Sequence, residues 1–177
     1  LQINTQHSID EQKSAEIELM LAGIYINKHK YALAGTKNKN ALVYLNKTTN
    51  DNANIEMHFK AFMNQGRIFE HIDSSELNTK HFIYNSDNKR TDYKTELKKR
   101  QITPINIFNA TKKSIALNLA LLSYKYAEEL LGSFDSEEQI HKSIEVRLAL
   151  GNLYLEVNDL KQAKSYYNAA LSLINEH

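Results

Sequence analysis

The stretch from residue 143 to residue 176 constrains the fold of this chain more than any other. Its apolar residues recur at steps of three and four, which places them on one face of an α-helix. Between two such runs, Asp159 and Gln162 form a D-x-x-Q box, a signal for a new helix start. The sequence therefore predicts two amphipathic helices joined by a short turn. Their apolar faces carry Leu150, Leu153, Tyr154 and Val157 in the first helix, and Ala163, Tyr167, Ala170, Leu171 and Ile174 in the second.

The spacing of small and aromatic residues in this stretch resembles one unit of a tetratricopeptide repeat. Gly151 follows a leucine, Tyr154 comes three residues later, and Ala163, Tyr167 and Ala170 follow at the spacings of that family. Such a unit is a pair of antiparallel helices, and successive units stack into a right-handed α-solenoid. The resemblance therefore implies an all-α fold of stacked antiparallel helix pairs, with no sheet.

Residues 15–48 form a weaker copy of the same pattern. The copy departs from it at Ala22, which stands in place of Gly151, and at Asn38, which stands in place of Tyr167. A gapless alignment of the two stretches pairs Tyr25 with Tyr154, Ala34 with Ala163 and Ala41 with Ala170.

Capping signals place the helices of this first copy. A box formed by Ser8 and Glu11 predicts a helix that starts near Ile9. Polar residues 27–30 can turn the chain, and a second helix is expected from Tyr31 to about Lys47.

A third, degenerate copy lies in residues 101–134, where Ala120, Tyr124 and Ala127 repeat the spacing of the last helix. Thr103 and Pro104 suit the N-cap and first turn of a helix, so we expect one to start there. A second helix is expected from 115 to 131. Three stacked units are about the minimum for a stable repeat array.

Two further segments complete a single domain over residues 1–177. A helix is predicted from Ile55 to Ile72; Gly66 inside it lowers helix stability by about 1 kcal/mol relative to Ala, but allows a close helix crossing. Around residues 74–102 the apolar signal fades, and we expect an irregular or extended charged helical insertion. Within it, residues 91–100 suit a helix with Tyr93 and Leu97 as inner residues. Ser136 and Gln139 predict the cap of the helix that follows the third copy.

The residues that usually carry catalysis are missing from the expected patterns. The chain has no cysteine, its seven histidines show no metal-ligand spacing, and it has neither a glycine-rich phosphate loop nor a Gly-x-Ser-x-Gly elbow. We therefore expect no catalytic residue, no cofactor, no metal and no enzymatic activity.

Composition bounds the location and the partner. Apolar residues make up 42% of the chain, charged residues 24%, and the net charge is +1, which gives no general attraction to nucleic acid or membrane. No run approaches the roughly 18 apolar residues that a membrane span needs. We expect a soluble protein, with a cytoplasmic location slightly favoured and export left open because the chain begins at Leu1 rather than Met. The sequence does not specify the oligomeric state.

The resemblance also implies a binding surface. In the tetratricopeptide family, the first helix of each unit lines a concave groove that holds a peptide or a partner helix. By helical spacing, the groove residues of the last unit are Glu145, Leu148, Asn152, Leu155 and Glu156, and those of the first unit are Glu16, Leu19, Gly23, Ile26 and Asn27. The alternative is that these side chains only cover the next helix.

One subfamily clamps the C-terminal carboxylate of heat-shock chaperones with Lys, Arg and Asn side chains in this groove. Leu19 and Leu148 stand where its lysine belongs, and only Asn152 matches. The resemblance therefore does not extend to that activity. Instead, the apolar and acidic lining favours a helical or apolar segment with some basic character.

Two classes of function follow. The first is a non-catalytic scaffold or adaptor that binds another protein or peptide on the groove face. The second is a nucleic-acid or anion-binding helical module that uses the basic segment 89–100. Asp87, Asp92 and Glu96 dilute the charge of that segment, so a solvated helix face is the simpler interpretation and nucleic acid is not the expected partner.

Overall fold

The structure is a computed structural model that describes residues 2–48, 52–73, 75–77, 82–84, 90–107 and 111–176. Nearly all of the described elements are helices, which confirms the all-α fold predicted from the sequence. In chain order they are α1 (Gln2–Asn27), α2 (Tyr31–Leu45), α3 (Asn52–His71), β1 (Phe82–Tyr84), β2 (Arg90–Asp92), α4 (Tyr93–Lys99), α5 (Thr111–Glu129), a 3-10 turn (Leu131–Ser133), α6 (Ser136–Glu156) and α7 (Leu160–Glu176).

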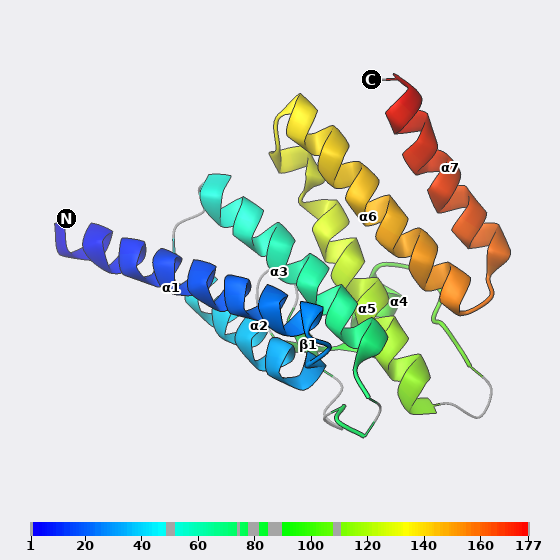
Figure 1. Cartoon of the computed structure of the whole chain (residues 1–177), viewed down its shortest axis with the longest axis horizontal. Helices are drawn as coiled ribbons and strands as arrows, with labels where there is room; N and C mark the ends of the chain where they lie inside the picture. Colours follow the sequence, from blue (N-terminus) through cyan, green and yellow to red (C-terminus); the bar gives the residue numbers. More distant parts are fainter. Residues whose placement is uncertain are drawn as a thin grey trace.

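The long helices form three antiparallel pairs that lie side by side. Helices α1 and α2 occupy one end of the array, α3 and α5 the middle, and α6 and α7 the other end (Figure 1). The central pair contacts both ends, because α3 packs against α1 and α2 while α5 packs against α6. The two chain termini therefore lie at opposite ends of the molecule (Figure 1).

The central pair is formed by helices that are distant in sequence. The predicted helix start at Thr103 and Pro104 is wrong, because residues 102–107, called the strap below, form neither helix nor strand and α5 begins at Thr111. The partner of α5 is instead α3, whose Phe62 ring lies 5.3 Å from the ring of Tyr126. The insertion at residues 72–110 thus separates the two helices of one pair.

Glycine permits the close crossing in two of the three pairs. A β-carbon on Gly66 of α3 would overlap the ring of Tyr124 on α5. A β-carbon on Gly151 of α6 would lie 2.6 Å from the ring of Tyr167 on α7. The first pair has no such ring, since Asn38 occupies that position and its amide donates to the Ala61 carbonyl oxygen of α3 at 2.9 Å.

Two of the pairs are closed by the same turn. His29 after α1 and Asn158 after α6 both adopt positive φ, at 55° and 59°. In each turn the next N–H bonds a carbonyl five residues back, as Asp159 does to Tyr154. The Asp159 carboxylate then accepts from the Gln162 N–H at 3.1 Å, which confirms the predicted helix start.

Two capping predictions are wrong. The first helix does not start near Ile9, because α1 already begins at Gln2 and runs through Ser8. The cap of α6 is Asp135 rather than Ser136, since the Asp135 carboxylate accepts from the Glu138 N–H at 3.0 Å. At Ser8 the helix continues through the predicted cap, and at Ser136 the preceding residue, Asp135, provides the cap instead.

The insertion contains a small β-hairpin that the sequence did not indicate. Strands β1 and β2 pair antiparallel, so the expectation of no sheet is wrong at this point. Helix α4 follows at once, and Tyr93 and Leu97 are buried in it as predicted. The strap after α4 is bound to α5 by Asn118, whose side chain accepts from the Ile105 N–H at 2.9 Å and donates to the Ile105 carbonyl at 2.8 Å.

Candidate partner-binding face

The predicted residues of α6 share one exposed face of that helix. Glu145, Leu148, Asn152, Leu155 and Glu156 are all exposed, whereas Val146, Leu150 and Leu153 on the opposite face are fully buried. Asn152 accepts a hydrogen bond from the Tyr167 hydroxyl at 2.7 Å. In the last pair, the structure therefore brings the predicted residues together on an open surface.

The residues predicted on α1 are not equivalent in exposure. Leu19 is 1% exposed and belongs to the hydrophobic core, so its assignment to an open groove is wrong. Gly23 faces open space, since a β-carbon there would meet no atom within 4 Å, and Asn27 and Glu16 are exposed. Ile26 is half-buried.

The position of Leu19 in its helix explains the difference. The alignment that equates Gly66 with Gly151 also equates Leu19, Met63 and Leu148 across α1, α3 and α6. Leu19 and Met63 are buried, because another pair packs beyond each of them, whereas Leu148 is 42% exposed. Leu148 is thus exposed because no described helix packs beyond α6 and α7.

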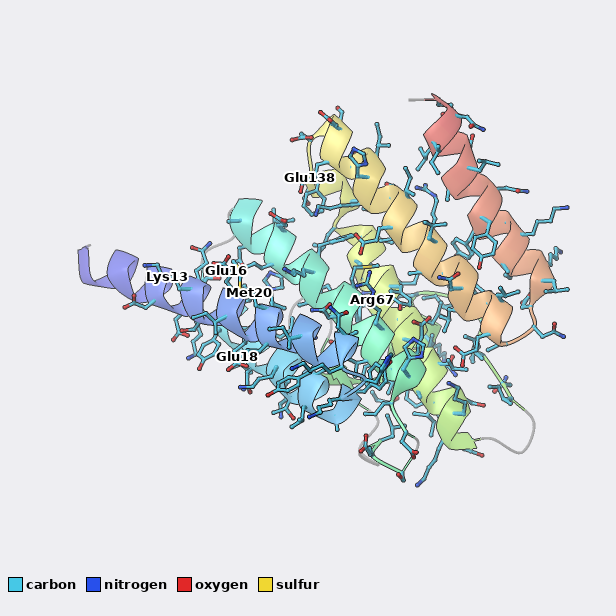
Figure 2. The ribbon with its side chains drawn as sticks, in the orientation of Figure 1. Lys13, Glu16, Glu18, Met20, Arg67 and Glu138 are labelled. Carbon is cyan, nitrogen blue, oxygen red and sulfur yellow. The ribbon has the colours of Figure 1, made fainter. Side chains whose placement is uncertain are left out.

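A cation on α3 that was not predicted, Arg67, also reaches this face. Arg67 occupies on α3 the place of Asn152 on α6, and it extends toward α6 (Figure 2). Its guanidinium donates to the Glu145 carboxylate at 3.0 Å, and Lys113 of α5 pairs with Glu156 at 2.6 Å. Both acidic residues of the α6 face are therefore paired with cations, so their effect on the charge preference of a ligand is reduced.

Glu70 lies beside this cluster, with little access to solvent. Its carboxylate accepts a hydrogen bond from the Tyr124 hydroxyl at 2.7 Å. The pKa of Glu70 is raised to about 7, chiefly by burial and to a smaller extent by the charge of Glu156, while the Tyr124 hydrogen bond, Arg67 and Lys113 act in the opposite direction. Because Tyr124 is fully buried, this pair holds α3 against α5 and its hydroxyl does not face a ligand.

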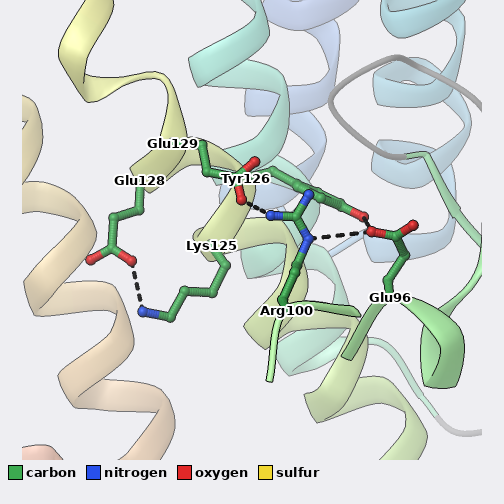
Figure 3. Close-up of polar contacts among 6 residues, drawn as sticks. All are labelled: Glu96, Arg100, Lys125, Tyr126, Glu128 and Glu129. Carbon is green, nitrogen blue, oxygen red and sulfur yellow. Dashed lines mark hydrogen bonds and ion pairs between the residues drawn. The ribbon is translucent and has the colours of Figure 1, made fainter. Parts of the chain in front are cut away.

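The basic segment of the insertion is partly used for structure. Arg100 pairs with Glu96 at 3.3 Å, contacts Glu129, and lies 4.5 Å from the centre of the Tyr126 ring (Figure 3). Its side chain therefore links α4 to α5 through these contacts. Lys94, Lys98 and Lys99 remain exposed on the outer surface of α4.

A cavity of about 640 Å³ lies between α4, the strap and the start of α5. Lys94 and Lys98 lie at its wall, one helical turn apart, and the rest of the wall is mixed, with Asn106, Thr111, Ser114 and Asn118 among its polar residues. Its other lining residues include Tyr93, Leu97, Ile102, Pro104, Ile107 and Ile115.

Within the described part of the chain, no helix is long and apolar enough to cross a membrane, and no three His, Asp or Glu residues gather as metal ligands would. No protein family, curated protein or solved structure matches this chain.

Proposed function

We propose that this chain is a non-catalytic interaction scaffold of tetratricopeptide-like helix pairs, and that it binds an amphipathic helix of a partner protein on the open face of α6. The family proposal is supported by the glycine and tyrosine crossing that recurs in two pairs, and by the turn that recurs after α1 and α6.

One observation carries the binding proposal. Leu148 is exposed where a following helix pair covers the equivalent Leu19 and Met63, and Leu155, about two turns further along the same face, is exposed as well. Apolar side chains on a rigid helix lose little conformational freedom on binding, so the open face of α6 is pre-organised for a helix. Asn152 lies between the two leucines along the helix and is also accessible.

A capture experiment with matched variants tests this proposal. Leu148→Glu places a charge at the centre of the face, and Leu33→Glu places the same charge on an equally exposed leucine of α2. Partner capture should fall at least tenfold with Leu148→Glu, fall with Asn152→Ala, and remain unchanged with Leu33→Glu. Equal capture by all variants, at unchanged helical content by circular dichroism, would place the binding surface elsewhere.

A second function, the binding of an anionic ligand, is favoured by the cavity beside α4. Lys94 and Lys98 at its wall supply positive charge, and neutral polar side chains such as Ser114 and Asn118 line the cavity beside them. Its test is salt-dependent binding of single-stranded RNA to the chain and to a variant with Lys94, Lys98 and Lys99 replaced by Gln. Arg100 is left in place, because its contacts with Glu96 and Tyr126 help to hold α4 against α5.

A further inference from the structure

The two ends of the array expose faces that, elsewhere in the same molecule, are packed against each other. On α2 and on α5, one face of the helix is covered by the first helix of the next pair. Leu42 and Leu45 of α2 are 1% exposed under α3, whereas the equivalent Leu171 and Ile174 of α7 are 53% and 54% exposed. The last pair thus presents an uncovered face of the type that α3 and α6 cover internally.

Individual contacts of α2 and α5 support the comparison of their covered faces with the exposed face of α7. The α2 face contacts α3 through Asn38, which bonds the Ala61 carbonyl, and through Gly35, where an added β-carbon would lie 3.7 Å from Ile68. On α5 the corresponding Leu117, Leu121 and Tyr124 are fully buried. On α7 the corresponding residues are Leu160, Lys164 and Tyr167, of which Leu160 is 60% exposed.

The other end of the array exposes the covering face. Helices α3 and α6 cover their neighbours with Ala61 and Ile68, and with Val146 and Leu153, all of which are nearly or fully buried. The same positions of α1 hold Ile17 and Ile24, which are 58% and 48% exposed. Met20 lies between them and is also exposed on this outermost helix (Figure 2).

We propose that the occupant of the α6–α7 end is the α1 end of a second copy of this chain. The proposal rests on the helix-binding function proposed above and names the partner. Ile17, Met20 and Ile24 of one copy would lie on Tyr167, Leu171 and Ile174 of the next, as α3 lies on α2. Leu148 of the first copy would be covered in the same contact, as Leu19 is covered internally.

The symmetry of this contact determines which kind of oligomer forms. The two faces differ, so the contact is head-to-tail, and every assembly that does not close into a ring leaves an α1 face and an α7 face free at its ends. The mass of the assembly should therefore rise continuously with concentration, as for an extended repeat array. Lys164 is the one charged residue in the α7 face; its aliphatic stem can lie along the apolar surface while its ammonium reaches the edge.

Complementation between two blocked variants of the whole chain tests the proposal. Ile24→Glu blocks the α1 face and Leu171→Glu blocks the α7 face. Each variant alone should be monomeric in sedimentation velocity at concentrations where the parent associates. An equimolar mixture should form a dimer and nothing larger, because each variant keeps one functional face. Leu33→Glu should associate like the parent, and Lys164→Leu should lower the concentration needed for association at least several-fold.

Other results overturn the proposal. If Leu171→Glu abolishes association and Ile24→Glu does not, the contact is a symmetric pairing of α7 faces. If the parent and Lys164→Leu remain monomeric at millimolar concentration, the occupant is not a second copy, although capture of another partner that depends on Leu148 would still support the proposed function. Met20→Lys and Ile174→Lys provide a second pair of blocking variants if either glutamate variant loses helical content.

Discussion

At Gly66 and Gly151, the absence of a β-carbon allows an aromatic ring to lie directly on a helix backbone. The two rings differ in their freedom to move. Tyr124 is fully buried and hydrogen-bonded to Glu70, whereas Tyr167 is half-buried at the end of the array. A substitution at Gly66 therefore has to displace a fixed ring, and one at Gly151 displaces a ring that has space on its outer side.

We expect Gly66→Ala to lower the free energy of unfolding by about 1–3 kcal/mol, because overpacking exceeds the gain in helix propensity. Gly151→Ala should lower it less. Gly23→Ala is the matched control, since no atom lies within 4 Å of its added β-carbon; it should raise stability by up to about 1 kcal/mol. Urea denaturation measures all three, and equal effects at Gly23 and Gly66 would contradict the close crossing.

The buried carboxyl of Glu70 makes stability depend on pH. Its folded-state pKa of about 7 exceeds the ordinary value of 4.5, so the folded chain binds this proton more tightly than the unfolded chain. The resulting stabilisation is complete below pH 4.5 and is lost as the pH rises through 7. The loss is about 3 kcal/mol at most.

Glu70→Gln removes this titration and keeps an acceptor for the Tyr124 hydroxyl. The stability of the variant relative to the parent should therefore increase between pH 5 and pH 8, as measured by urea unfolding at each pH. A pH-independent difference would show that Glu70 titrates normally. Lys113→Gln removes a cation that lowers the pKa of Glu70. The stability of this variant should therefore fall more steeply with rising pH than that of the parent.

At the scale of single elements, Arg100 contributes to the attachment of α4 to α5, beside the buried Tyr93 and Leu97. The Glu96 side chain beside it is almost fully buried, and the Tyr126 hydroxyl donates to the same carboxylate at 3.2 Å. Arg100→Met removes the cation from this partly buried pair and should lower stability by about 2–3 kcal/mol. Lys98→Met, on the exposed side of the same helix, should change it by less than about 0.5 kcal/mol. Thermal unfolding of the two variants compares them directly.

The elements that short turns connect were the ones that the sequence predicted well. The turn after α1, the start of α2 and the Asp159 cap all depend on neighbouring residues, so local patterns specify them. The central pair was missed because Gly66 and Tyr124, which contact each other, lie on either side of a long insertion. The hairpin was missed because its strands span only three residues each, too few to show alternation.

The candidate face on α6 was also predicted only where it depends on neighbouring residues. Its α6 residues follow from helical periodicity, but Arg67 could have been found only by aligning Gly66 with Gly151. The burial of Leu19 depends on how successive pairs pack, which no pattern within one helix specifies. Periodicity therefore identified which residues share a face, and only the packing showed which faces remain open.

At the scale of the whole molecule, burial is concentrated in the centre of the array. Residues 115–122 of α5 are buried without interruption, whereas Ala163 and Ala170 are the buried residues of α7. Hydrogen exchange should therefore be slowest in α5 and fastest, among α5, α6 and α7, in α7, because local opening of α7 exposes little apolar surface. Uniform protection across the three helices would indicate that the end pair unfolds only with the centre.

The insertion between α3 and α5 also affects the order in which the molecule folds. The two end pairs are hairpins that close over short turns, but the central pair has to bring together helices separated by on the order of 40 residues. Loop closure costs about 0.6 kcal/mol for each doubling of length, so the central pair carries about 2 kcal/mol more closure entropy than its neighbours. The central pair, which is the best-buried part of the molecule, should thus form last. The two end pairs should form earlier as helical hairpins, and the packing of α5 on α3 should complete the array.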